Sequence, residues 1–293
     1  MIVSASYRTD IPAFYGAWFM HRLQAGSCRV ASPYGGPSLT VPLTRDRVDG
    51  FVFWTRNVAP FLGPLAEIRD QGFPFVLQQT ITGYPRALEA SVPEPDRGAA
   101  QLVAIAARFG RRVAVWRYDP VLLTSLTDAA WHRATFARIV RALRGSTDEV
   151  VISFTHFYAK TRTNLAAAAR RHGFEWRDPA PDERRALLTE FAGIAANNGL
   201  RLTLCAQPDL LVAGTSPARC IDAERLSDVA GEQIRAAQKG NRPGCACVES
   251  RDIGAYDSCP HGCVYCYAVR SPIAARRRFR AHDARGDFLI GPG

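Results

Sequence analysis

Ile2-Val3-Ser4-Ala5, at the start of the chain, is a short apolar stretch that predicts a buried strand. It is followed by Asp10-Ile11-Pro12, in which an acidic residue and a nearby proline provide the N-cap and first turn of a helix. That helix is expected to run toward Gly26. The opening unit is therefore a strand followed by a helix, and the rest of the chain repeats this pattern.

The same strand signal recurs along the chain, with helical patterns between its occurrences. Further strands are predicted at residues 51–54, 75–77, 113–116, 150–154 and 200–204. Amphipathic helices are predicted at residues 128–143, 164–172 and 182–198, each closed by a glycine at 145, 173 or 199. Strands and helices that alternate in this way indicate a parallel sheet with right-handed crossovers. We expect an α/β fold, a TIM-barrel-like partial (β/α)6 barrel, with a complete eight-unit barrel as the alternative.

Length and composition set the expected domain organisation. The chain has 293 residues, of which 47% are apolar, and this is enough to bury one large core. We expect a barrel domain over residues 1–215 and a C-terminal cysteine-rich, metal-binding extension over residues 216–293, packed on the barrel mouth. The segment 31–49 is rich in Gly and Pro and is expected to be a long loop.

The sequence also restricts where the protein is expected to work. No apolar run approaches the roughly 20 residues that cross a bilayer. The first residues, up to Tyr7, lack the charged start and hydrophobic stretch of a signal peptide. We therefore expect a cytoplasmic protein that does not contact a membrane.

Three cysteines lie close together near the C-terminus, in Cys259-Pro260-His261-Gly262-Cys263-Val264-Tyr265-Cys266. In a reducing cytosol, grouped cysteines usually bind metal or carry out redox chemistry instead of forming disulfides. Pro260 and Gly262 force a tight turn, which lets the three sulfurs face one point while backbone N–H groups turn inward. Iron–sulfur ligation, a zinc site and inert thiols are the alternatives that the spacing leaves open.

This spacing resembles the C-x3-C-x-aromatic-C signature of radical S-adenosylmethionine enzymes. The resemblance implies that Cys259, Cys263 and Cys266 bind a 4Fe-4S cluster whose fourth iron holds S-adenosyl-L-methionine, and that Tyr265 packs near the adenine. It also implies one-electron cleavage of that cofactor, and an electron donor such as flavodoxin or ferredoxin. The signature normally follows the first strand of the barrel, so either the order here is permuted or the tail folds back over the mouth. The family's glycine-rich motif after the second strand is replaced by Trp54-Thr55-Arg56-Asn57.

Beyond the cysteine loop, nearly the whole chain resembles the bacterial domain-of-unknown-function family 1848. The segments that carry this resemblance are Met1-Ile2-Val3-Ser4-Ala5-Ser6, Arg8-Thr9-Asp10-Ile11-Pro12, Phe53-Trp54-Thr55-Arg56-Asn57, Arg117-Tyr118-Asp119-Pro120 and Cys220-Ile221-Asp222. The resemblance implies a cytoplasmic protein with a cluster like that of radical enzymes near its end. It brings no established reaction or substrate.

Polar residues follow each predicted strand, where the active site of a barrel is built. The candidates for cofactor binding are Arg8, Asp10, Arg56, Asn57, Arg117 and Asp119. The arginines suit a carboxylate or phosphate, and the two aspartates suit ribose hydroxyls or an ammonium group. Pairing between these arginines and aspartates is the alternative. No catalytic residue is assigned, and His156 is interpreted as a packing residue.

Four of the other cysteines lie between the sixth strand and the loop, at Cys205, Cys220, Cys245 and Cys247. Four thiolates complete the coordination of a second 4Fe-4S cluster or of a tetrahedral zinc ion, which makes them a candidate second metal site. Two alternatives remain open. Cys205 belongs to the core, or Cys245 and Cys247 join the signature loop in one structural zinc site.

The net charge of +10 raises the question of a polyanionic partner. Most basic residues are arginines spread along the chain, but those from Arg270 to Arg285 gather directly after the cysteine loop. They suit contacts to phosphate or nucleic acid, and a solvated face is the alternative. Small-molecule and nucleic-acid substrates both remain open. Two further functions fit these residues: a zinc-stabilised nucleic-acid-binding module, and a DNA-repair lyase of the spore photoproduct lyase type.

Overall fold

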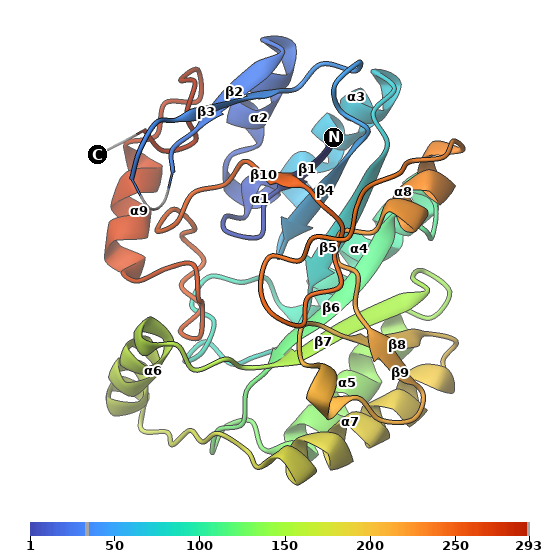
Figure 1. The fold of residues 1–293 in the computed structure, drawn as a ribbon. Helices are drawn as coiled ribbons and strands as arrows, with labels where there is room; N and C mark the ends of the chain where they lie inside the picture. Colours follow the sequence, from blue (N-terminus) through green and yellow to red (C-terminus); the bar gives the residue numbers. More distant parts are fainter. Residues whose placement is uncertain (33–34, 292–293) are drawn as a thin grey trace.

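Eight strands form a single sheet in the computed structural model, which describes residues 1–32 and 35–291 (Figure 1). They follow the order β10-β1-β4-β5-β6-β7-β8-β9, and every neighbouring pair is parallel. The strands are β1 (Ile2–Ala5), β4 (Gly50–Thr55), β5 (Phe75–Thr80), β6 (Ala114–Val121), β7 (Glu149–Phe154), β8 (Arg201–Leu204), β9 (Thr215–Pro217) and β10 (Arg251–Asp252). The last strand in the chain therefore lies beside the first.

Helices connect the strands. They are α1 (Ile11–Phe14), α2 (Gly16–Gln24), α3 (Leu62–Asp70), α4 (Pro95–Phe109), α5 (Ala129–Ala142), α6 (Ala159–His172), α7 (Pro181–Ala196), α8 (Ala223–Ala230) and α9 (Pro272–Arg280). Short 3-10 turns lie at Ala59–Phe61 and Pro208–Leu210, and β2 (Ser27–Val30) pairs antiparallel with β3 (Leu39–Pro42). Among the described residues, no helix is both long and apolar enough to pass through a membrane.

The predicted α/β class is confirmed, and each of the six predicted strands overlaps a strand of the sheet. The sheet is open, and its edge strands, β9 and β10, do not pair with each other. The alternative of a complete eight-unit barrel is therefore wrong, because short edge strands at opposite ends of the order leave the sheet unclosed. The likeness to a partial (β/α)6 barrel stays a prediction. The predicted domain boundary at 215 and 216 falls inside β9.

Two further predictions need correction at the N-terminal end. The single helix expected from Asp10 is split into α1 and α2, because the chain turns at Tyr15 and Gly16 packs against Phe61, where a Cβ would come within 2.9 Å of that ring. Asp10 does cap α1 as expected, accepting a hydrogen bond from the Ala13 amide at 2.9 Å. The loop expected over residues 31–49 contains β3, and Pro33 and Tyr34 lie outside the described residues.

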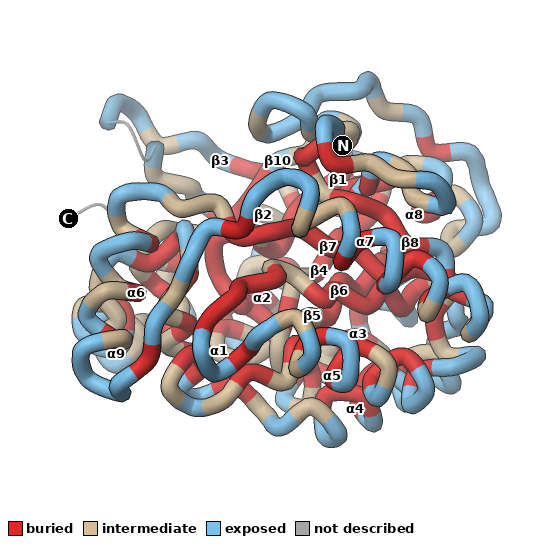
Figure 2. Tube along the Cα trace, turned by 90° about the horizontal axis from the view of Figure 1, so that it is seen from below, coloured by how far each residue is buried: buried red, intermediate tan, exposed pale blue. Residues whose placement is uncertain are grey.

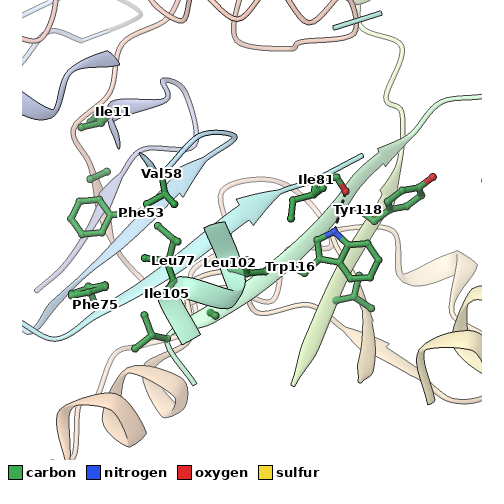
Figure 3. Close-up of a cluster of buried hydrophobic side chains, with 14 of the residues drawn as sticks. Ile11, Phe53, Val58, Phe75, Leu77, Ile81, Leu102, Ile105, Trp116 and Tyr118 are labelled. Carbon is green, nitrogen blue, oxygen red and sulfur yellow. Dashed lines mark hydrogen bonds between the residues drawn. The ribbon is translucent and has the colours of Figure 1, made fainter. Parts of the chain in front are cut away.

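One face of the sheet packs against the helices through large apolar side chains. Alternate strand residues point to this face, because side chains in a strand alternate between its two sides. Phe53, Phe75, Leu77 and Trp116 are among them, and α4 covers them with residues such as Leu102 (Figure 3). Full burial of each such side chain contributes about 1.5–3 kcal/mol. Buried segments accordingly run through the strands, and exposed segments lie mainly around them (Figure 2).

The opposite face begins with a layer of smaller apolar residues. It contains Ile2, Val52, Val76, Val115 and Val151, one from each of five neighbouring strands. The C-terminal third of the chain covers this layer, mainly through α8 and the cysteine-bearing segments on either side of it. In α8 the buried Arg225 pairs with Asp148 at 2.9 Å and with Glu149 at 2.6 Å, where β7 begins. α8 therefore covers this face near the N-terminal ends of the strands. Polar residues line the space near the C-terminal ends.

His132 supports the helix-covered side of β6. It is buried and lies between the Tyr118 hydroxyl, 2.8 Å from Nδ1, and the Leu122 carbonyl, 3.0 Å from Nε2. Burial lowers the pKa of His132 from 6.5 to about 4, although the Leu122 carbonyl favours the charged ring. Between these two pH values the unfolded chain binds a proton that the folded protein does not.

We therefore expect the free energy of unfolding to fall as the pH drops through this window. Between pH 7 and pH 5 the His132 contribution is about 2 kcal/mol. Urea unfolding of the protein and of His132→Gln, which keeps a donor for the Leu122 carbonyl, measures it. The wild-type protein should lose about 2 kcal/mol more than the variant over this range, and equal losses would contradict the buried neutral ring.

Candidate metal and cofactor site

A cavity of about 860 Å³ opens at the C-terminal ends of the strands, above the valine layer. Residues at the ends of β1, β4, β5, β6, β7 and β8 line it, as does the segment from Lys239 to Ala268. The polar strand ends that the sequence predicted are thereby brought together. Arg8, Asp10, Arg56, Arg117 and Asp119 all line the cavity.

Strand alternation explains which side chains enter the cavity. In β6, Val115 lies in the valine layer, and Arg117 and Asp119 follow on the same side. Asn57 does not line the cavity, because its side chain lies on the helix side, where Oδ1 accepts a hydrogen bond from Gln101 Nε2 at 2.8 Å. His156 does line the cavity, and its Nε2 is buried without a hydrogen-bond partner.

The cysteine loop forms part of the cavity wall, and Cys259, Cys263 and Cys266 all line it. His261 holds the loop in place, with Nε2 2.8 Å from Asp10 Oδ2 and Nδ1 3.1 Å from the Ser91 carbonyl. Gly262 has φ +76°, a conformation that side chains other than glycine rarely adopt. The expected tight turn is therefore present, and it lies against the residues that follow β1 and β5.

The carboxylate of Asp252 fixes the start of this segment beside β1. It accepts hydrogen bonds from Ser4 Oγ at 2.9 Å, from Ser6 Oγ at 2.9 Å and from Arg8 Nε at 2.8 Å. It also accepts from the backbone amides of Tyr7 and Gly254. Because Asp252 lies in β10, these bonds fasten β10 to β1. The cysteine loop consequently begins at the sheet edge, next to the first strand (Figure 1).

The three predicted arginines are all paired with carboxylates inside the chain. Arg8 pairs with Asp252 at 2.8 Å, Arg56 with Glu89 at 2.6 Å, and Arg117 with Asp119. Although burial opposes it, Arg117 keeps the pKa of Asp119 below its usual value. Pairing of arginines with carboxylates is thus the arrangement that the structure adopts. Sequence reasoning missed Glu89 and Asp252, because neither lies in a periodic segment.

Tyr265 belongs to the Arg56 and Glu89 network. Arg56 Nη2 donates to the Tyr265 hydroxyl at 2.6 Å, and that hydroxyl donates to Glu89 Oε1. Burial raises the pKa of Tyr265 well above its usual value. The hydroxyl is therefore neutral and held by protein partners. The packing of the ring against an adenine stays a prediction.

The second group of cysteines also lines this cavity. Cys205 and Cys220 place their Sγ atoms 3.8 Å apart, and the Ile221 amide, next to Cys220, donates to Cys247 Sγ at 3.4 Å. Cys245 lies two residues before Cys247 and lines the same cavity wall. Cys245 and Cys247 thus lie with Cys220 and Cys205. The structure brings together the four residues that the sequence grouped.

The donor chemistry of the cavity suits a thiophilic metal. Over the described residues, 1–32 and 35–291, no three His, Cys, Asp or Glu side chains converge on one ion position as they stand. All eight cysteines are free thiols. Burial, then Asp10 and the neighbouring thiols of Cys266 and Cys263, raise the pKa of Cys259. A thiol with a raised pKa, such as Cys259, stays neutral until a cation replaces its proton, and soft metals provide that exchange. By donor type alone, the cysteines would suit an iron–sulfur cluster or zinc.

The basic segment after the loop is exposed. Within it, α9 carries Arg276, Arg277, Arg278 and Arg280 on its surface, and the Arg278 guanidinium donates to the Tyr256 carbonyl at 3.2 Å. Within the described ranges, 1–32 and 35–291, the side chains of these four arginines make no other hydrogen bond or ion pair. This surface agrees with a solvated face and is equally accessible to a polyanion.

Removal of the Asp252 carboxylate tests how the loop is attached. Asp252→Ala leaves the buried Arg8 guanidinium unpaired, so we expect the free energy of unfolding to fall by about 3–5 kcal/mol. Hydrogen exchange of residues 251–268 should also become faster. The control is Asp228→Ala, which removes an exposed partner of Arg112 and should cost less than about 1 kcal/mol. Similar losses in both variants would contradict the anchoring role.

Comparison with known families gives a match that covers most of the chain. The family described as "Domain of unknown function (DUF1848)" matches residues 2–268, which include every strand of the sheet and the whole cysteine loop. No curated protein and no solved structure matches the chain. On the strength of this nearly full-length match, the protein belongs to the DUF1848 family.

Proposed function

We propose that this protein is an iron–sulfur enzyme of the radical S-adenosylmethionine type, with Cys259, Cys263 and Cys266 as the ligands of a 4Fe-4S cluster. One observation carries the proposal: the cysteine loop directly follows β10, which lies parallel to β1 at the sheet edge. The cysteine-bearing unit is the last one in the sequence, but its strand lies at the edge of the sheet, next to the first strand of the chain. In the enzymes that the loop resembles, the signature follows the first strand of the barrel.

The strand order supports a circularly permuted partial barrel. Starting from β10, the strands follow as β10, β1, β4, β5, β6, β7, β8 and β9, all parallel, and the first six would be the units of the partial barrel. β10, the cysteine loop and α9 then form the first strand–loop–helix unit. The second unit is β1 with the segment Ser6-Tyr7-Arg8-Thr9-Asp10. That segment, and not Trp54 to Asn57, occupies the place of the family's glycine-rich motif. It contains no glycine, so side chains would hold the cofactor's amino acid moiety instead.

The residues around the loop have defined tasks in this proposal. Asp10 holds the loop through His261 and also accepts a hydrogen bond from the Arg56 amide at 2.7 Å. Asp119 keeps a negative charge in the cavity, which suits an ammonium group or ribose hydroxyls. The network of Arg56, Glu89 and Tyr265 orients the chain between Cys263 and Cys266.

When bound, a cluster of this type would supply the single electron that reduces S-adenosyl-L-methionine, and the cofactor would then take a hydrogen atom from the substrate. The chain contributes binding, orientation and exclusion of water. The proposal requires an electron donor such as flavodoxin or ferredoxin, and a reducing cytoplasm would suit the free thiols of the chain. The substrate stays open between a small molecule and a nucleic acid.

The exposed arginines of α9 would suit one version of this function, a DNA-repair lyase of the spore photoproduct lyase type, if the substrate is a nucleic acid. They lie directly after the loop and are accessible to phosphates. The other candidate, a zinc-stabilised nucleic-acid-binding module, uses the same arginines but gives the cavity of about 860 Å³ no role. We therefore favour the enzyme.

Anaerobic purification tests the cluster. We expect about four irons per chain at Cys259, Cys263 and Cys266, and an electron paramagnetic resonance signal from the reduced protein that changes when S-adenosyl-L-methionine is added. Cys263→Ala should lose the iron and the signal. The matched control is Cys28→Ala, which alters a buried cysteine that does not line the cavity. A colourless wild-type protein, or iron retained in Cys263→Ala, would sink the proposal.

A further inference from the structure

We propose that Cys205, Cys220, Cys245 and Cys247 form a second metal site, a tetrahedral zinc site of four thiolates in the wall of the same cavity. The four residues come from three separate segments. Cys205 follows β8, Cys220 follows β9, and the other two lie in the segment before β10. The fold therefore gathers them from across the chain. The site is independent of the iron–sulfur cluster proposed above.

The distance between two of the four sulfurs indicates which kind of metal fits. Zinc binds thiolates at about 2.3 Å with tetrahedral angles, which places the sulfurs about 3.8 Å apart. The Sγ atoms of Cys205 and Cys220 are 3.8 Å apart. Thiolates that bind separate irons of a 4Fe-4S cluster lie farther apart than this. A single tetrahedral ion therefore fits the observed pair better than a cluster does.

The surroundings already supply donors to three of the sulfurs. Arg117 Nη1 lies 3.0 Å from Cys220 Sγ, and Arg242 Nη2 lies 3.5 Å from Cys205 Sγ. The Ile221 amide donates to Cys247 Sγ at 3.4 Å. A zinc ion with four thiolates carries a charge of −2, and the guanidinium groups offset part of it. Donors of this kind orient metal ligands and are typical of thiolate sites.

The segment that carries Cys245 is folded too tightly to accept larger residues. A Cβ on Gly240 would lie 2.4 Å from the Cys245 carbonyl oxygen and 2.7 Å from its Cβ. Gly244 has φ +74°, and a Cβ there would approach Pro208 at 2.8 Å. These two glycines let the chain wrap around Cys245. Metal binding then requires the half-buried Cys205 and Cys245 to move closer to the buried Cys220 and Cys247.

The proposed zinc site has a structural role, because four protein ligands leave no open coordination position. It connects the end of β8, the segment after β9 and the approach to β10. Cys220 and Cys247 also belong to the apolar cluster that covers the valine layer. The ion would therefore hold the cavity wall and the strand that precedes the cysteine loop.

Metal analysis of two variants tests this inference. The anaerobically purified protein should contain about one zinc per chain. Cys247→Ser should lose the zinc and keep most of its iron, whereas Cys263→Ala should keep the zinc and lose the iron. Cys28→Ser, the control, should keep both. A wild-type protein without iron that still binds zinc through Cys247 would refute the proposed function and leave this inference intact.

Three results would overturn the zinc assignment. They are a wild-type protein without zinc, zinc that survives Cys247→Ser, and about eight irons per chain that fall to about four in Cys247→Ser. Because Cys247 lies in a buried apolar cluster, cobalt(II) reconstitution of Cys263→Ala provides a second measurement that does not depend on the folding of Cys247→Ser. Intense absorption from tetrahedral thiolate-bound cobalt is expected, and its absence would contradict the site.

Discussion

The buried carboxylate of Asp252 is the interaction on which the candidate site depends. Two residues are too few to form a strand by themselves, and β10 exists because Asp252 binds Ser4, Ser6 and Arg8 at the end of β1. This network brings a segment from the end of the chain to the first strand, almost 250 residues away in sequence. The cysteine loop begins seven residues after Asp252, so its position at the cavity follows from the same contacts.

The two faces of the sheet have different roles, one in the stability of the fold and the other in the candidate site. One face buries aromatic and aliphatic side chains against helices, and the other carries a thin valine layer below a polar cavity. In that cavity Arg8, Arg56 and Arg117 are paired with carboxylates of the same chain, and the cysteines are its other distinctive donors. Seven of the eight cysteines line the cavity, and they form two groups with different sulfur environments. The proposed iron–sulfur cluster and the proposed zinc ion would account for both groups.

The sequence was sufficient where local patterns decide structure. Residues 150–154 are apolar except for Ser153, as is typical of a parallel strand buried on both faces, and β7 forms there. The cysteine loop and the polar strand ends were likewise readable from spacing. Tertiary contacts decided the rest. Arg251-Asp252 has no strand pattern, and Glu89 lies in an irregular segment. α4 was not predicted, because its first turn contains Gly98, a poor helix former. In the structure Gly98 leaves space for the Ile81 side chain. The split between α1 and α2 depends on Phe61, which lies far away in sequence.

The central claim is that the last unit of the chain holds an iron–sulfur cluster at the sheet edge beside the first strand. Anomalous diffraction at the iron absorption edge, from crystals of anaerobically purified protein, tests it most directly. The account predicts an iron peak bounded by Cys259, Cys263 and Cys266, next to the C-terminal end of β1. Iron located elsewhere, or zinc alone within the loop, would contradict it.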